Sequence, residues 1–196
     1  NDPRCDRSYA IAEQTQLRPR EAKTTCESQP VNRRTMTVTM TSAEQPAPEL
    51  RVRQWIDVDG TPLDVPVTLS DLGEGPKILF AFQHWCRGCH LHGFPTLQRL
   101  HASLATRGVG FAVIQTVFEG EHENTFEKLR VNQVKYDLPV SFGHDPIPEG
   151  TRLPTFMEDY RTRGTPWFSV IDAGGAVIFS DFHLDADKLV AHLERG

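Results

Sequence analysis

Stretches of uninterrupted apolar residues alternate along this chain with stretches in which apolar residues recur every three or four positions. Residues 78–82 (Ile-Leu-Phe-Ala-Phe) contain no polar side chain, and residues 109–117 are nearly as apolar. Runs of this kind are typical of strands that are covered on both faces. A helix-like stretch follows each run, and this order predicts two parallel strands joined by right-handed crossovers.

Helical spacing is clearest in three segments. The first follows Cys89, and its apolar stripe consists of Leu91, Phe94, Leu97, Leu100 and Leu104. We expect a helix with one buried side here, kinked at Pro95. Residues 121–135 are compatible with a second helix, whose apolar side would hold Phe126, Leu129 and Val134. In the last segment Asp185 is the expected N-cap, and the stripe consists of Ala186, Leu189, Val190 and Leu193.

Shorter strands are expected on either side of this core. Residues 52–57 alternate loosely between polar and apolar, and the chain then turns at Asp59-Gly60. Residues 167–171 and 176–179 flank the sequence Asp172-Ala173-Gly174-Gly175. This arrangement predicts an antiparallel hairpin whose glycines supply positive φ.

The first 49 residues differ from the rest of the chain. They hold a single aromatic residue, Tyr9, and end in a proline-containing stretch that reads as a linker. Apolar density rises sharply at Leu50. We therefore expect residues 1–49 to be a flexible N-terminal segment and residues 50–196 to form one domain.

The native status of the earliest residues is open. Met36 lies inside this segment, so one hypothesis is that residues 1–35 precede the natural start. In that case Cys5 and Cys26 have no role. If the segment is native and exported, these two cysteines could pair.

Composition narrows the possible partners. The chain has 196 residues, of which 38% are hydrophobic and 24% charged, so it can bury a core. Its formal net charge of −5 makes nucleic acid an unfavourable partner. Its longest apolar runs are far shorter than the roughly 18 residues that a membrane-spanning helix needs. We therefore expect neither nucleic-acid binding nor an integral membrane segment.

Two cysteines, Cys86 and Cys89, stand between the first buried strand and the helix after it. A cysteine at a helix N-terminus faces unpaired N–H groups and the positive end of the dipole, which favour the thiolate. Cys86 is therefore the predicted nucleophile, and Cys89, one turn further on, is predicted to resolve a mixed disulfide. Arg87, together with His84 or His90 if protonated, would lower the pKa of Cys86.

Other chemistry uses the same spacing. Cys89-His90 completes the C-x-x-C-H pattern of c-type haem attachment, but that use requires an accessible loop rather than a strand-to-helix junction. Structural zinc needs four ligands, and the three nearby histidines, His84, His90 and His92, would have to converge on both sulfurs. We favour redox chemistry, which needs no metal or organic cofactor.

Several motifs follow one another in a characteristic order. They are a buried strand, Trp85-Cys86-x-x-Cys89, a helix with Phe94-Pro95, a parallel strand, and Gly164-Thr165-Pro166 leading into a glycine-turned hairpin. In this order they resemble the thioredoxin superfamily over about residues 50–196. Trp55-x-x-x-Asp59-Gly60 and an extra helical segment after the second parallel strand are similar to its TlpA/ResA-type, peroxiredoxin-like branch.

This resemblance implies a three-layer α/β/α fold, with a central mixed sheet, helices on both faces and an inserted helix after the second core strand. It also implies a cis bond between Thr165 and Pro166, packed against the Cys86 end of the helix. In this family the residue before the proline offers its backbone to an extended stretch of substrate. Thr165 and Pro166 would then bind a protein thiol or disulfide, with Trp85 and Trp167 as an apolar platform.

Two positions depart from the family pattern. Phe80 replaces the buried acid of thioredoxins, and His92 replaces the glutamate that follows the second cysteine in ResA-like proteins. The usual proton acceptor for Cys89 is therefore missing, and His92 is a candidate substitute because imidazole titrates near neutral pH. The dipeptide Arg87-Gly88 should stabilise the thiolate and make the couple more oxidising than a thioredoxin with a neutral dipeptide.

The sequence thus predicts a thiol-disulfide oxidoreductase with the Cys86-x-x-Cys89 dithiol, which an external redox donor or acceptor resets. Two alternatives stay open. A thiol peroxidase shares the fold, although Gln83 stands where a Thr or Ser would align the peroxide. A Cu(I)-binding chaperone would use both cysteines and a distant histidine, His144 or His183.

The expected localisation depends on the family resemblance and on the visible N-terminal sequence. ResA-like relatives generally work outside the cytoplasm, held there by a signal or an anchor. Neither is visible in the sequence, so we expect a cytoplasmic protein, or an extracytoplasmic one if a signal or anchor has been removed.

Overall fold

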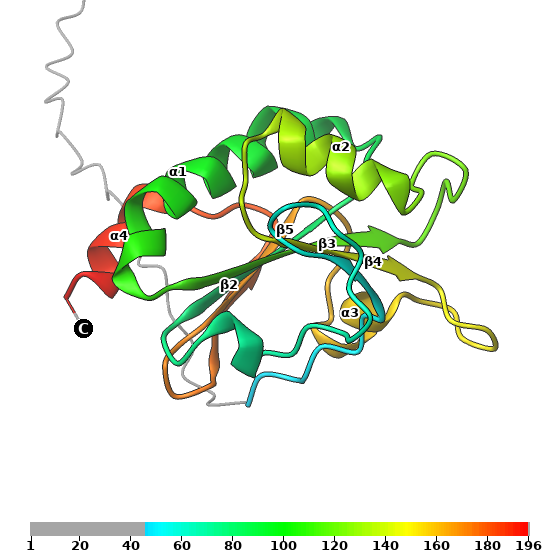
Figure 1. Ribbon diagram of the computed structural model, residues 1–196. Helices are drawn as coiled ribbons and strands as arrows, with labels where there is room; N and C mark the ends of the chain where they lie inside the picture. Colours follow the sequence, from blue (N-terminus) through cyan, green and yellow to red (C-terminus); the bar gives the residue numbers. More distant parts are fainter. Residues whose placement is uncertain (1–45, 196) are drawn as a thin grey trace, which may run out of the picture. The chain divides into compact units, whose positions relative to one another are not determined.

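A six-stranded mixed sheet forms the centre of the computed structural model, which describes residues 46–195 (Figure 1). The strands are β1 (Gln54–Ile56), β2 (Lys77–Phe82), β3 (Gly110–Val117), β4 (Ser141–Pro146), β5 (Trp167–Ile171) and β6 (Val177–Asp181). Their order across the sheet is β1-β4-β3-β2-β5-β6. The three central strands β4, β3 and β2 are parallel, whereas β1, β5 and β6 are antiparallel to their neighbours.

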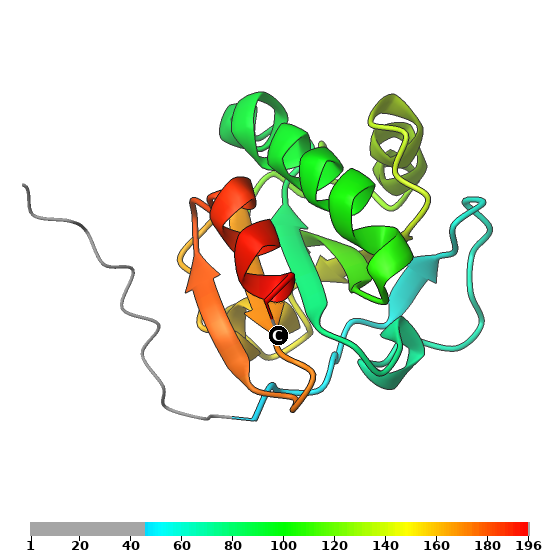
Figure 2. The ribbon, with the colours of Figure 1, turned by 90° about the vertical axis from the view of Figure 1, so that its left-hand side faces the viewer.

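Helices cover both faces of this sheet. The helices are α1 (Phe94–Leu104), α2 (Glu127–Lys135), α3 (Thr155–Asp159) and α4 (Ala186–Leu193), with short turns η1 (Ser70–Leu72), η2 (Cys89–Gly93) and η3 (Ala105–Arg107). Helices α1, α2 and α4 pack on one face, and α3 packs on the other (Figures 1 and 2). The expected three-layer α/β/α fold, with a helix inserted after the second core strand, is confirmed.

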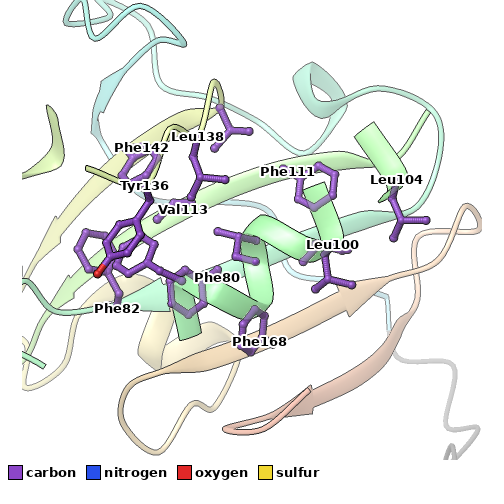
Figure 3. Close-up of a cluster of buried hydrophobic side chains, with 14 of the residues drawn as sticks. Phe80, Phe82, Leu100, Leu104, Phe111, Val113, Tyr136, Leu138, Phe142 and Phe168 are labelled. Carbon is purple, nitrogen blue, oxygen red and sulfur yellow. The ribbon is translucent and has the colours of Figure 1, made fainter. Parts of the chain in front are cut away.

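Alternating side chains of the central strands build one core on each face. Phe80 and Phe82 of β2 point toward α1 together with Val113 of β3, in the cluster shown in Figure 3. Leu79 and Ala81 of the same strand point to the opposite face, toward α3. Every residue of β2 is therefore buried, which explains its uninterrupted apolar run.

The helix after the cysteines begins differently from the predicted one. In η2 the backbone N–H of Phe94 bonds to the carbonyl of Cys89, five residues earlier, which is a π-helical turn. This wider turn shifts the register, so the side chain of Leu91 is 55% exposed and the prediction of a buried Leu91 was wrong. Pro95, where we expected a kink, stands at the change from π-helix to α-helix.

Helix α2 also departs from the prediction. It begins at Glu127 rather than at residue 121. The prediction that Val134 lies on its buried apolar side was wrong, because Val134 is 61% exposed. Leu129 is buried as expected, but the other buried residues are the polar Asn132 and Gln133. A polar residue that finds its partners inside the protein breaks the apolar period on which the prediction depended.

Strand β4 and helix α3 were not predicted. The strand reads Ser-Phe-Gly-His-Asp-Pro, without the alternation or apolar run of an ordinary strand. Its Asp145 accepts hydrogen bonds from the backbone N–H groups of Thr155 and Phe156 and from the Thr155 hydroxyl. This carboxylate therefore holds the first turn of α3, a contact that only the folded chain creates.

The remaining elements agree with the sequence. β2 and β3 pair in parallel, and β5 and β6 form the antiparallel hairpin. The side chain of Asp185 accepts from the backbone N–H of Lys188, as expected of an N-cap. No helix within residues 46–195 has the length and apolar character needed to span a bilayer.

At the N-terminal side, contacts of the folded unit extend back to Pro46. This residue forms an isolated bridge with Ala176, and the N–H of Ala47 donates to the carbonyl of Gly175. The expectation of a flexible segment falls mostly on residues 1–45, which lie outside the described residues together with Cys5 and Cys26.

Candidate active site

Cys86 and Cys89 lie just beyond the carboxyl end of β2, in the turn that leads into η2. Both are reduced thiols; Cys86 is partly exposed and Cys89 is fully buried. The backbone N–H of Cys89 donates to Sγ of Cys86 at 3.2 Å. The same sulfur lies 3.5 Å from the carbonyl oxygen of Thr165. Only one of the two sulfurs is therefore open to another molecule.

The two thiols have opposite acidities. A hydrogen bond from the Cys89 thiol, together with the Thr165 side chain and the N–H groups of Cys89 and Gly88, lowers the pKa of Cys86 to about 6 despite its partial burial. Burial raises the pKa of Cys89, and the adjacent Cys86 sulfur raises it further. At neutral pH the accessible sulfur is therefore mainly thiolate and the buried one is thiol.

The predicted cationic neighbours do not produce this acidity. Arg87 is exposed and forms no ion pair within residues 46–195. Burial lowers the pKa of His84, which favours its uncharged ring. Hydrogen bonds at the turn, rather than Arg87 or His84, are the principal cause of the low pKa of Cys86.

The bond between Thr165 and Pro166 is cis, as the resemblance implied. The ring of Pro166 packs against the dithiol turn: a Cβ on Gly88 would lie 3.3 Å from Pro166 Cδ, and one on Gly93 only 2.9 Å from Pro166 Cβ. The same added atom on Gly93 would lie 2.6 Å from the ring of Phe80. Phe80, at the position of the family's buried acid, therefore forms an apolar floor under this turn.

A groove of about 380 Å³ opens beside Cys86. It is lined by Gln83, Trp85, Cys86, Phe118, Glu119, Arg163, Gly164, Thr165 and Phe182. Three of these nine residues are aromatic, whereas Gln83, Glu119, Arg163 and Thr165 are polar or charged, so its walls are mixed in character. A larger hollow of about 790 Å³ lies beside residues 50–54 and β4, but no cysteine lines it.

Of the two tryptophans expected beside the cysteines, only Trp85 lines the groove. Its side chain is 48% exposed, its indole N–H donates to Oε1 of Gln83 at 3.0 Å, and its ring lies against Gly120. Trp167 is only 5% exposed and packs in the core that faces α3. Its ring contacts Phe182 edge-on, and Phe182 lines the groove instead. The expected platform is therefore corrected to exclude Trp167.

His92 does not reach the position of a proton acceptor for Cys89. Its side chain is exposed and lines a separate hollow with His183 and Thr96, and no cysteine lines that hollow. The role expected for His92 therefore has no support in the geometry. The Cys89 thiol instead donates a hydrogen bond to the sulfur of Cys86.

Polar residues that sequence reasoning passed over hold the site together. Oδ1 of Asn124 accepts from the backbone N–H of His84 at 2.6 Å, and Nδ2 of Asn124 donates to the carbonyls of Glu119 and Gly120. Asn132 lies 3.0 Å from Nδ1 of His84. Both asparagines are almost completely buried. Asparagine is common in exposed loops, so no sequence signal marked these two.

Among the residues that the structure describes, the positions that bear on metal or peroxide chemistry do not assemble such a site around the dithiol. Within residues 46–195, no group of three or more His, Cys, Asp or Glu side chains could hold a metal ion. His144 lies in the sheet, close to Gln115 at 3.1 Å and edge-on to Phe126. His183 lines the hollow with His92. Gln83 is buried and donates to the carbonyl of Glu119, and its amide offers no hydroxyl for a peroxide.

Comparison with known proteins agrees with this geometry. No protein-family model matches the sequence, and no curated protein does. A crystal structure of a thioredoxin-like superfamily protein matches with a TM-score of 0.66 and 30% identity, covering 76% of this chain and 94% of that one. A thiol-disulfide isomerase from Corynebacterium glutamicum matches with a TM-score of 0.64 and 28% identity, covering 76% and 95%.

A third structure shares the fold at much lower identity. It is the thioredoxin domain of a thiol-disulfide oxidoreductase from Bacteroides vulgatus, with a TM-score of 0.57 and 16% identity, covering 78% of this chain and 95% of that one. With the first of these matches at 30% identity over nearly its whole length, the chain belongs to the thioredoxin-like superfamily and is a thioredoxin-like oxidoreductase.

Proposed function

We propose that this protein exchanges disulfides with protein substrates, with Cys86 as the nucleophile and Cys89 as the resolving thiol. The observation that carries the proposal is the asymmetry of the pair. Cys86 is partly exposed at a groove, and its pKa is lowered to about 6. Cys89 is buried directly behind it, and its pKa is raised. An accessible thiolate backed by a shielded thiol suits two successive attacks on sulfur.

In the first step, the Cys86 thiolate attacks one sulfur of a substrate disulfide. A bond forms between Cys86 and that sulfur as the substrate S–S bond breaks, and the other substrate sulfur leaves as a thiolate. The backbone N–H of Cys89, 3.2 Å from the Cys86 sulfur, stabilises the thiolate before attack.

In the second step, Cys89 attacks Cys86 and releases the remaining substrate thiolate. The products are a Cys86–Cys89 disulfide and a fully reduced substrate, so two electrons have passed to the substrate. The negative Cys86 sulfur is one of the causes that raise the pKa of Cys89. That charge disappears in the mixed disulfide, so Cys89 becomes easier to deprotonate when its thiolate is needed.

An external thiol or disulfide partner then resets the pair, and the same steps in reverse oxidise a substrate dithiol. The groove supports a polypeptide substrate. Its lining includes the aromatic side chains of Trp85 and Phe182, and Thr165 borders it next to Cys86. An extended chain that carries the reacting cysteine can add backbone hydrogen bonds there.

Trapping of mixed disulfides tests the proposal. Cys89→Ser should leave covalent complexes between Cys86 and partner proteins, because the resolving sulfur is gone. The matched control, Cys86→Ser, should trap none, and complexes should disappear on reduction with dithiothreitol. Equal trapping by both variants, or none by either, would refute the assignment of nucleophile and resolver.

A further inference from the structure

The ring of His90, the residue after Cys89, has both nitrogens engaged. Nε2 lies 2.5 Å from the backbone carbonyl oxygen of His84, and Nδ1 lies 2.5 Å from the hydroxyl of Tyr136. A carbonyl oxygen can only accept, so Nε2 carries a proton and donates it to His84. In the uncharged ring, Nδ1 accepts from the Tyr136 hydroxyl. Lys135, 3.5 Å from Nδ1, also approaches this nitrogen.

Aromatic contacts hold the ring in this orientation. His90 stacks on Phe94 at a centroid distance of 5.8 Å and on Tyr136 at the same distance. Phe94 and Tyr136 stack on each other at 4.0 Å. The imidazole is therefore fixed by packing from α1 and from the end of α2, as well as by its hydrogen bonds.

The bond from His90 to His84 closes the segment that contains Cys86. Inside it, the N–H of His90 donates to the carbonyl of Cys86 at 3.3 Å, and the N–H of Cys86 donates to the carbonyl of Gln83, just before the segment, at 3.1 Å. The ring thus ties together the two ends of residues 84–90. The position of Cys86 relative to the N–H of Cys89 depends on the shape of this loop.

The other end of the loop is anchored as well. The backbone N–H of His84 donates to Oδ1 of Asn124, and the ring of His84 lies 3.0 Å from Nδ2 of Asn132. Asn132 is fully buried on α2, although it is polar. Asn132 on α2, and Tyr136 just after it, therefore contact the two histidines on either side of the cysteines.

We propose that His90 is a positioning residue for the dithiol: its Nε2–H clamps the carbonyl of His84 and so holds the Cys86 sulfur in line with the N–H of Cys89. The inference deepens the proposed function and rests on it. It differs from the expected role of His90 as a nearby positive charge, because the clamp requires a directed donor. Without the clamp, the thiolate loses part of its stabilisation.

Two substitutions distinguish the effect of the hydrogen bond to the His84 carbonyl from the effect of filling the space that the His90 ring occupies. The amide nitrogen of glutamine reaches about as far as Nε2 of histidine, so His90→Gln can still donate to His84. The amide of asparagine reaches only as far as Nδ1, so His90→Asn cannot. The pH dependence of ultraviolet thiolate absorbance measures the pKa of Cys86 in each variant, with thermal unfolding as a check that each is folded.

We expect His90→Asn to raise the pKa of Cys86 by about one unit, a tenfold smaller ratio of thiolate to thiol at a given pH. His90→Gln should shift it by much less. Equal pKa values in the two folded variants would overturn the inference. A third variant, Tyr136→Phe, keeps the stacking but removes the hydroxyl, and should raise the pKa by a smaller amount. If His90→Asn does not fold, an unchanged pKa in Tyr136→Phe overturns the inference instead.

This titration needs no substrate, so its outcome is separate from that of the trapping experiment. A shifted pKa with no trapping in Cys89→Ser would refute the proposed function alone. Normal trapping with no difference between His90→Asn and His90→Gln would refute only the positioning role.

Discussion

Replacement of Gly93 by alanine tests the contact between the dithiol turn and the cis-proline. Gly93 has φ −62° and ψ −61°, so the backbone accepts alanine without strain. Space is the obstacle, because the new Cβ would lie 2.6 Å from the ring of Phe80 and 2.9 Å from Cβ of Pro166. Both neighbours are rigid rings in a packed environment, so they can give way only by moving the segments that carry them.

The magnitude follows from two opposing effects. Overpacking of a filled site typically costs about 1–3 kcal/mol. Replacement of glycine by alanine in a helical conformation recovers about 0.5–1 kcal/mol. Two contacts below 3.0 Å favour the upper part of the overpacking range, about 2–3 kcal/mol. We therefore expect Gly93→Ala to lower the free energy of unfolding by about 1–2.5 kcal/mol, which for a domain of this size lowers Tm by roughly 2–10 °C.

Gly88→Ala is the matched control. Gly88 also has helical φ and ψ, but its new Cβ would lie 3.3 Å from Cδ of Pro166 and 4.0 Å from the sulfur of Cys86. This change should lower the free energy of unfolding by less than about 1 kcal/mol, or leave it unchanged. Urea unfolding of the reduced proteins measures both values. If Gly93→Ala is as stable as wild type, then Phe80 and Pro166 do not close on this turn and the description of the site is wrong.

Further predictions test the chemistry and the packing. The alkylation rate of Cys86 should fall as pH drops through about 6, because the reactive thiolate becomes protonated below its pKa; a midpoint near 9 would contradict the hydrogen-bonding argument. Trp167→Ala should destabilise the fold by about 3–5 kcal/mol in urea unfolding, because it empties a core site. Trp85→Ala should cost less than about 1 kcal/mol but slow mixed-disulfide formation with peptides; similar stability losses for both would contradict their placement. Asn124→Ala should lower the free energy of unfolding by about 1–3 kcal/mol, because it leaves the N–H of His84 without its acceptor. Unchanged stability would argue against that hydrogen bond.

The asymmetry of the two thiols arises mainly from hydrogen bonds and burial rather than from neighbouring cationic side chains. The pKa of Cys86 is lowered mainly by hydrogen bonds, whereas burial is the largest cause of the raised pKa of Cys89. Arg87, which the sequence suggested as the source of a low pKa, is exposed. A charge in solvent is screened, and its effect on a neighbour is small compared with that of a directed hydrogen bond.

Local patterns in the sequence are sufficient to predict several of the elements. The apolar run of β2, the hairpin of β5 and β6, and the capped helix α4 each follow from patterns within one segment. The dithiol could also be placed, because a strand followed by a helix puts Cys86 at the helix N-terminus. The cis bond before Pro166 was expected only from the family resemblance.

Other features depend on contacts between segments that are distant in the sequence, so they follow only from the folded structure. Trp167 follows Pro166 directly, but which face of the sheet its ring occupies depends on the pairing of β5 with β2 and β6. Leu91 is exposed because η2 is a π-helical turn, and Asn132 is buried because a histidine on another segment lies beside it. The spacing of apolar residues along the chain reflects only the local helix or strand period. The burial or exposure of these three side chains depends instead on which segments contact one another in the folded protein.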